Sequence, residues 1–340
     1  MFLNQTTYPV GSSPYSVAVV DVNSDNKPDI LVANFGSNTT SVLLNTGSGT
    51  FSVQTTYPVG SSPSSVAVVD VNSDNKPDIV VANSGSNRVS VLLNTGSGTF
   101  NAQITYPVST SPYSVAVVDV NSDNKPDIVV ANFLSNTVSV LLNTGSGTFI
   151  AQTTYSVGTY PYSVAVVDVN SDNKPDIVVV NRGSNNVSVL LNTGNGTFNT
   201  QTTYAVGSSP YSVVVVDVNS DSKPDIVVAN EGSNTASVLL NAGNGIFNNQ
   251  TTYSVGSSPY SVAVADVNSD NKPDIVVVNR GSNTASILLN AGNGTFNAPT
   301  TYPVGSGPYS VAVVDVNSDS KPDIITANYG SNTVSVLLHC

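Results

Sequence analysis

Residues 21–30 read DVNSDNKPDI and place three aspartates and two asparagines within nine positions of a chain in which only 9% of residues are charged. Near-copies of this cluster begin at Asp70, Asp119, Asp168, Asp217, Asp266 and Asp315, always 49 residues apart. The 49-residue unit covers the whole 340-residue chain, with units starting near residues 1, 50, 99, 148, 197, 246 and 295. A fixed internal period of this length indicates a repeat architecture, which must be interpreted by its period before anything else.

Each unit predicts four short strands separated by turn segments rich in Gly, Ser, Asn and Pro. In the first unit we expect strands over 15–22, 30–33, 41–44 and 51–59. These segments are nearly continuous in apolar and β-branched residues, which predicts burial on both faces of a sheet. No segment has apolar residues at the helical spacing of 3.6, so we expect almost no helix.

Four-stranded sheets buried on both faces can stack against copies of themselves, and radial stacking closes such sheets into a ring. The sequence therefore predicts an all-β protein, a seven-bladed β-propeller that forms a single domain over residues 1–340. An open β-solenoid is the alternative architecture. It would need atypical, polar capping units at both ends, and none is visible.

The two ends of the chain support a closed ring. The chain begins with what is elsewhere the fourth strand of a unit, 2–10, and finishes with a third strand, 335–338. In a ring the N-terminal strand would pair with the C-terminal strand and complete the seventh blade. This pairing removes an unpaired sheet edge that would otherwise favour aggregation.

The net charge of −12 belongs to the clusters and is not spread over the surface. Of the 22 acidic residues, 21 lie in the clusters and only Glu231 lies elsewhere. The seven lysines are likewise one per cluster, which leaves Arg88, Arg182 and Arg280 as the other basic side chains. An acidic chain of this kind is not expected to bind nucleic acid.

His339 and Cys340 are the only histidine and the only cysteine, so neither an intrachain disulfide nor a Cys/His zinc site is expected. There is no apolar run of 18 residues, and we expect no membrane-spanning helix. No signal-like segment precedes the first unit, which we interpret as a mature or trimmed form of the protein.

The cluster has the spacing of an oxygen-ligand metal loop. Asp21, Asn23, Asp25 and Asp29 occupy positions one, three, five and nine, and Lys27 at position seven offers its backbone carbonyl. Short oxygen-bearing side chains at odd positions of a tight loop suit a hard cation, Ca²⁺ rather than Mg²⁺. The predicted metal ligands of the seven loops are Asp21, Asn23, Asp25, Lys27, Asp29, Asp70, Asn72, Asp74, Lys76, Asp78, Asp119, Asn121, Asp123, Lys125, Asp127, Asp168, Asn170, Asp172, Lys174, Asp176, Asp217, Asn219, Asp221, Lys223, Asp225, Asp266, Asn268, Asp270, Lys272, Asp274, Asp315, Asn317, Asp319, Lys321 and Asp323.

The simpler interpretation is an Asx-rich turn whose carboxylates accept backbone N–H groups. Two observations favour the cation. The cluster recurs seven times and holds nearly every acidic residue of the chain. Three carboxylates within about 5 Å of one another also repel strongly unless a cation lies among them.

The unit DVNSDNKPDIVVAN…VSVLLNTGSGTF…TTYPVGSSPYSVAV resembles the FG-GAP/VCBS repeat family, which is related to the propeller heads of integrin α subunits, and the resemblance covers essentially the whole chain. The family pattern, roughly DxDxDGxxD followed by an apolar strand and a GxGTF turn, is matched at Asp21, Asn23, Asp25, Asp29, Gly47, Gly49, Thr50 and Phe51. The resemblance implies a propeller with about one Ca²⁺ per blade, seven in all, bound between the first and second strands with the Lys27 carbonyl as a ligand.

Two departures from the family pattern weaken the expected sites. Asparagine replaces the usual aspartate at position three, as at Asn23, and Asn or Ser replaces the usual glycine at position six, as at Asn26 and Ser222. Asn tolerates a positive φ at this bend better than Ser does. We expect dissociation constants of around 10⁻⁴ to 10⁻³ M, the range of extracellular modules.

No enzymatic activity is expected, because every aspartate belongs to a cluster and no base is placed to activate a serine or threonine. We expect a calcium-binding module for protein interaction or adhesion, with structural Ca²⁺ in each blade of a monomeric ring. Weak calcium loops fill only at millimolar Ca²⁺, so we expect an extracellular or cell-surface location. A structural spacer in a larger secreted protein is a further alternative.

Positions that vary between nearly identical units are candidates for partner contact. One such position follows the second strand and holds Phe35, Ser84, Phe133, Arg182, Glu231, Arg280 and Tyr329; a second holds Thr39, Arg88, Thr137, Asn186, Thr235, Thr284 and Thr333. Drift on a solvated loop is the simpler interpretation, and a partner-contact rim is the functional one. Glycan binding is the alternative function, through Tyr15, Tyr113, Tyr162, Tyr211, Tyr260 and Tyr309, although these tyrosines are expected mainly to pack at strand starts and seal the rim between blades.

Overall fold

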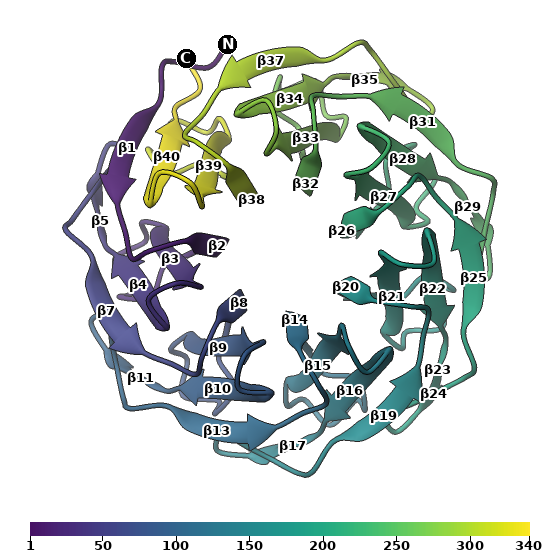
Figure 1. Ribbon diagram of the computed structural model, residues 1–340, viewed down its shortest axis with the longest axis horizontal. Coiled ribbons are helices and arrows are strands. Elements are labelled where there is room, and N and C mark those ends of the chain that lie inside the picture. The colour runs from purple at the N-terminus through teal and green to yellow at the C-terminus, as the bar shows by residue number, and fades with distance from the viewer.

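Each unit folds into a four-stranded antiparallel sheet, and the seven sheets are arranged around a common axis as the blades of a propeller (Figure 1). The structure is a computed structural model that describes residues 1–340, and its regular elements are all strands. The predicted all-β, seven-bladed propeller is confirmed. No helix of the length and apolar character needed to cross a bilayer is present.

The innermost strand of each blade begins at a proline and leads into the aspartate cluster. These strands are β2 (Pro14–Val20), β8 (Pro63–Val69), β14 (Pro112–Val118), β20 (Pro161–Val167), β26 (Pro210–Val216), β32 (Pro259–Ala265) and β38 (Pro308–Val314). The second strands are β3 (Asp29–Asn34), β9 (Asp78–Asn83), β15 (Asp127–Asn132), β21 (Asp176–Asn181), β27 (Asp225–Asn230), β33 (Asp274–Asn279) and β39 (Asp323–Asn328).

The third strands are β4 (Thr39–Leu43), β10 (Arg88–Leu92), β16 (Thr137–Leu141), β22 (Asn186–Leu190), β28 (Thr235–Leu239), β34 (Thr284–Leu288) and β40 (Thr333–Leu337). The outermost strands are β1 (Thr6–Pro9), β7 (Thr55–Pro58), β13 (Ile104–Pro107), β19 (Thr153–Ser156), β25 (Thr202–Ala205), β31 (Thr251–Ser254) and β37 (Thr300–Pro303). Every residue of the second strands is buried, since each of these strands lies between two others and between two blades.

A short hairpin joins the third strand to the outermost strand in six places. The hairpins are β5 (Asn45–Gly47) with β6 (Thr50–Phe51), β11 (Asn94–Gly96) with β12 (Thr99–Phe100), β17 (Asn143–Gly145) with β18 (Thr148–Phe149), β23 (Asn192–Gly194) with β24 (Thr197–Phe198), β29 (Asn241–Gly243) with β30 (Ile246–Phe247), and β35 (Asn290–Gly292) with β36 (Thr295–Phe296). The expected strand over 51–59 is therefore wrong, because it is two elements. The Asn45 Oδ1 accepts the Gly47 N–H at 2.9 Å, and this Asx turn starts the separate hairpin.

The hydrophobic core is divided into seven clusters, each built from two neighbouring blades. The cluster between the seventh and first blades, for example, joins Val32 of β3 to Ala327 of β39. Stacking between blades thus buries the apolar faces that a single sheet would leave exposed, which is the main source of stability in this architecture.

Seven serine hydroxyls link neighbouring innermost strands in a closed circle. The Val66 N–H donates to the Ser16 Oγ at 3.2 Å, and the Val17 N–H donates to the Ser310 Oγ at 3.2 Å. The five other links have the same form, with Ser65, Ser114, Ser163, Ser212 and Ser261 as acceptors. The circle has no break at the join between the two chain ends.

The N-terminal strand closes the ring as predicted. β1 pairs antiparallel with β40, from Thr6 opposite Val336 to Pro9 opposite Thr333. The two termini lie together in Figure 1, and the Cys340 N–H donates to the Met1 carbonyl at 2.9 Å. The seventh blade is therefore built from both ends of the chain.

Candidate functional site

The charged side chains divide between the two faces of the ring. The loops after the innermost strands carry the aspartate clusters, and we call this side the aspartate face; the opposite side, with the loops before the innermost strands and after the second strands, is the mouth face. The aspartate face has 21 aspartates and seven lysines, a formal charge of −14, whereas the mouth face has three arginines and Glu231, a formal charge of +2.

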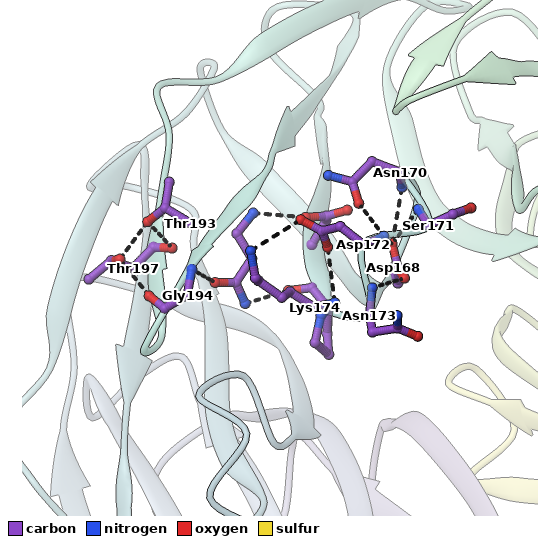
Figure 2. A network of polar contacts seen from close by, with 12 residues as sticks. Asp168, Asn170, Ser171, Asp172, Asn173, Lys174, Thr193, Gly194 and Thr197 are labelled. Carbon is purple, nitrogen blue, oxygen red and sulfur yellow. Dashed lines mark hydrogen bonds and ion pairs between the residues drawn. The ribbon is translucent and has the colours of Figure 1, made fainter.

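In the fourth unit, the first carboxylate organises the whole loop (Figure 2). The Asp168 Oδ1 accepts the N–H groups of Asn170 at 3.1 Å and Ser171 at 2.7 Å, and its Oδ2 accepts the Asn173 N–H at 2.7 Å. The Asp172 Oδ1 accepts the Lys174 N–H at 3.0 Å. The loop is thus a series of Asx turns wound around Asp168.

Two residues of this loop adopt the left-handed conformation, Ser171 at φ 63° and Asn173 at φ 63°. The bend at position six, expected from the sequence, is found in all seven loops, including Ser222 and Ser320 at φ 66°. The second left-handed residue, at position four, is a serine in every loop and is not expected from the sequence pattern. Such conformations are costly for serine, so the surrounding hydrogen bonds must hold them in place.

The last aspartate of each cluster is buried at the start of the second strand. The Asp176 Oδ2 accepts the Val169 N–H at 3.0 Å, and its Oδ1 accepts the Asn192 N–H at 2.8 Å. Burial raises the pKa of Asp176 to about 6; the two backbone N–H groups oppose this change, and the charges of Asp172 and Asp168 add to it. Asp176 therefore ties the loop to the hairpin β23–β24 at an electrostatic cost.

An asparagine beside this aspartate connects each loop to the neighbouring blade. The Asn192 Nδ2 donates to the Pro175 carbonyl of its own loop and to the Val120 carbonyl of the preceding blade, both at 2.9 Å. This asparagine was not predicted as a functional residue, although it recurs in six units of the sequence. The seventh unit has His339 at this position, and the His339 Nδ1 is buried without a hydrogen-bond partner.

The loops offer the donor set that a hard divalent cation requires, namely carboxylate and amide oxygens. In this structure those oxygens accept backbone N–H groups, and no three acidic, histidine or cysteine side chains converge on one point. The remaining acceptor of the loop, the Asp172 Oδ2, lies 3.4 Å from the Lys174 Nζ in an exposed ion pair. Each carboxylate oxygen has two lone pairs, so Asp168 and Asp172 keep capacity for a cation if Lys174 gives way.

The structure thus gathers four of the five predicted ligands of this loop, Asp168, Asn170, Asp172 and Lys174, into one hydrogen-bonded turn. The fifth, Asp176, faces the hairpin as well as the loop. Equivalent lysine–aspartate pairs occur in five other loops at 3.3 to 3.6 Å. Metal ligation by these residues remains a prediction.

On the mouth face, tyrosines fill the central channel. The pairing of β2 with β3 shifts between Pro14 and Ser16, and this bulge turns Tyr15 toward the axis. Six such tyrosines and the serines beside them line a cavity of about 90 Å³. The ring centroids of Tyr211 and Tyr162, and of Tyr211 and Tyr260, are 4.2 Å apart. The tyrosines were expected to seal the rim between blades, and the structure instead places them across the channel.

The variable residues after the second strands contact this tyrosine ring. Phe35 stacks on Tyr15 with centroids 5.4 Å apart, and Tyr329 stacks on Tyr309 at 4.7 Å. The Arg182 guanidinium lies over Tyr211, with 5.0 Å between Cζ and the ring centroid. Further contacts join Phe133 to Tyr113 and Arg280 to both Tyr260 and Tyr309. Five of the seven variable positions therefore belong to one aromatic and cationic surface, which we call the channel mouth.

The molecule is a closed ring of seven four-stranded antiparallel sheets, and each sheet has an aspartate-rich loop after its first strand. It therefore belongs to the class of β-propellers with one such loop per blade. The model of the FG-GAP-like repeat matches this chain six times, over residues 21–81, 70–130, 119–179, 168–228, 217–277 and 266–326. The protein belongs to the FG-GAP-like repeat family.

Solved structures confirm the fold alone. A streptogramin B lyase is 15% identical with a TM-score of 0.71, and 99% of this chain and 98% of that chain are covered. Virginiamycin B lyase from Staphylococcus aureus is 14% identical with a TM-score of 0.70 over 100% of both chains. BBS1N, in its complex with ARL6DN, is 12% identical with a TM-score of 0.70 over 99% of this chain and 96% of that chain. No curated protein matches the sequence.

Proposed function

We propose that this protein is a non-catalytic, calcium-stabilised β-propeller that acts outside the cell as a protein-interaction or adhesion module. The observation that carries the proposal is a difference in sequence variation between the two faces. The aspartate face repeats one loop seven times, as expected for a structural role. The mouth face instead carries a position that differs from unit to unit, with Phe35, Ser84, Phe133, Arg182, Glu231, Arg280 and Tyr329, as expected for a surface that recognises one partner.

The aspartate loops are the proposed calcium sites. In the fourth unit, Asp168, Asn170 and Asp172 would hold the ion through side-chain oxygens, and Lys174 would do so through its carbonyl. A bound Ca²⁺ supplies the positive charge that the three carboxylates of the loop lack. This chain's own residues meanwhile hold the loop through backbone N–H groups, and Asn192 connects it to the preceding blade.

The chemistry of the channel mouth supports a role without catalysis. The only acidic side chain of the mouth face is Glu231, and no histidine, cysteine or lysine lies on this face. Burial raises the pKa of Tyr15 and of Tyr162 well above the ordinary tyrosine value, so these hydroxyls stay protonated and are poor bases. The channel mouth therefore offers no histidine or lysine that could act as a general base.

A protein partner fits the channel mouth better than a glycan does. Tyrosine, phenylalanine and arginine are the residue types that dominate binding energy at protein interfaces. The proposed extracellular location rests on the expected weakness of the calcium sites, which would require millimolar Ca²⁺ to fill.

Thermal unfolding with and without calcium tests the proposal. With a dissociation constant of about 10⁻³ M, 5 mM Ca²⁺ contributes about 1 kcal/mol per site, or about 7 kcal/mol for seven sites. For a chain of this length that corresponds to a rise in Tm of about 10 °C. Equal concentrations of Mg²⁺ serve as the control. A Tm that is the same in calcium and in chelator would rule out the calcium part of the proposal.

A further inference from the structure

We infer that the channel mouth binds an acidic peptide segment, whose carboxylate is held by Arg182 and Arg280 above the tyrosine ring. This inference rests on the proposed role of the mouth face as the binding face, and it names the chemistry of the ligand. The two arginines come from the fourth and sixth blades, and a pair of touching tyrosines, Tyr211 and Tyr260, connects them.

Arg182 is a guanidinium without a polar partner inside the protein. Its Nε is buried and has no hydrogen-bond partner, although the group lies 5.0 Å above the Tyr211 ring. The ion pairs of the structure all join lysine to aspartate on the other face, so Glu231 of the next blade does not pair with it. A ligand cannot reach this buried Nε, but the two Nη groups are neither buried nor hydrogen-bonded within the protein, so they remain available to an anion.

Arg280 is held in place yet keeps donors free. Its Nη1 donates to the Tyr260 hydroxyl at 3.2 Å, and its guanidinium lies 5.2 and 5.3 Å from the centroids of Tyr260 and Tyr309. A guanidinium has five N–H donors in a planar fork that matches a carboxylate. Because the tyrosines fix its orientation, less side-chain entropy is lost when it binds an anion.

The charge of the surroundings selects an anion. The mouth face has a formal charge of +2, and all seven lysines lie on the opposite face. Glu231 is the one acid near the two arginines, and its charge acts on the same Tyr211 that Arg182 covers. We therefore expect Glu231 to weaken the binding of a carboxylate.

The aromatic residues of the channel mouth favour a peptide over an acidic sugar. Aromatic side chains of the mouth face can pack against apolar peptide residues. One example is Phe133, which stacks on Tyr160 with ring centroids 4.7 Å apart, and Tyr160 is 41% exposed. Rigid aromatic residues of this kind provide contact area at low entropic cost.

The test measures fluorescence anisotropy of labelled poly-L-glutamate, in 1 mM Ca²⁺ and about 0.1 M NaCl. Its neutral analogue, poly(hydroxyethyl-L-glutamine), is the ligand control. The double variant Arg182→Gln/Arg280→Gln should weaken binding by about tenfold or more, since charge-assisted hydrogen bonds are lost. Glu231→Gln should strengthen it by about threefold.

Arg88→Gln is the matched protein control. Arg88 lies on the same face and has the same charge, but its Nε donates to the Thr105 Oγ1 at 2.9 Å at the outer edge of the blade. We expect it to change affinity by less than about twofold. An equal loss in Arg88→Gln would show a general charge effect and overturn the inference.

Two other results would overturn the inference as well. In the first, poly-L-glutamate does not bind at all. In the second, oligogalacturonate binds at the arginines although poly-L-glutamate does not. The second result would assign the site to an acidic glycan. Melting curves of the same variants, with and without calcium, separate this inference from the proposed function. If poly-L-glutamate does not bind but calcium still raises the Tm, only the inference is refuted. If poly-L-glutamate binds at the arginines but calcium does not raise the Tm, only the calcium-stabilised module is refuted.

Discussion

Joining the two ends of the chain with Gly-Ser-Gly should stabilise the ring. Cys340 occupies the repeat position of Ala291, and Met1 occupies that of Thr50, so three residues separate the ends in the register of the repeat. The Cys340 N–H already donates to the Met1 carbonyl at 2.9 Å, and Phe2 already forms a bridge with His339. The linker would therefore complete a seventh hairpin of the kind seen in the other six units, without strain.

The size of the effect follows from chain entropy. Closing a loop of about 340 residues removes about 6 kcal/mol of unfolded-state entropy at 25 °C. With an unfolding entropy of about 2.1 cal/mol/K per residue, the Tm should rise by about 8 °C. Cyclised protein and linear protein would be compared by calorimetry and by guanidinium unfolding.

Two controls sharpen this measurement. Cutting the cyclised protein once, between Gly145 and Ser146 in the hairpin turn of the third unit, should return the Tm to the linear value, because that turn is equivalent to the seam. Joining Cys340 directly to Met1, with no linker, should destabilise the protein because the hairpin needs its turn. If the Gly-Ser-Gly form melts no higher than the linear chain, or if the direct join is equally stable, the closure through β1 and β40 is not as described.

Three further predictions concern single features of the structure. His339→Asn should add about 1 kcal/mol of stability by restoring the hydrogen bond to the preceding blade, and Asn290→His should remove a similar amount. Urea unfolding of both variants checks this. A loss of stability in His339→Asn or a gain in Asn290→His would contradict it. Lys174→Gln should tighten calcium binding at its loop a few-fold, because it frees the Asp172 carboxylate and keeps the backbone carbonyl. Isothermal titration calorimetry of the variant and the parent protein measures the two affinities. Weaker binding in the variant would mean that the Lys174 ammonium does not compete with calcium for Asp172. In metal-free buffer the Tm should rise as the pH falls from 7.5 to 5, since burial raises the pKa of Asp29, Asp78, Asp127, Asp176 and Asp225 to about 6. Stability present below pH 4 is therefore lost as the pH rises through 6. A Tm that falls as the pH falls over this range would refute the reasoning.

The ring could be predicted from the sequence because its evidence is periodic. The fixed spacing of the clusters gave the number of blades, and the offset between the first and last strands indicated closure by β1. The links between blades were not predicted. Ser16 and Asn192 recur in the sequence, but nothing in a single chain shows that their partners lie in the neighbouring unit.

Two local predictions failed for reasons that lie in the backbone. Tyr15 was expected to pack between blades, and a bulge after Pro14 turns it into the channel instead. The expected strand over 51–59 is interrupted because the Asn45 side chain starts an Asx turn, and Phe51 then belongs to a separate hairpin. Bulges and Asx turns depend on one or two hydrogen bonds, which an alternation of apolar residues does not reveal.

The central claim is that each blade carries one calcium site in its aspartate loop, and a count of bound metal tests it most directly. The protein would be equilibrated by dialysis against 5 mM Ca²⁺, and bound calcium per chain would be measured by atomic emission. With dissociation constants of about 10⁻⁴ to 10⁻³ M, we predict about six to seven ions per chain, and about one ion fewer in the variant Asp168→Asn/Asp172→Asn. A count near zero, or a count that the variant leaves unchanged, would contradict the claim.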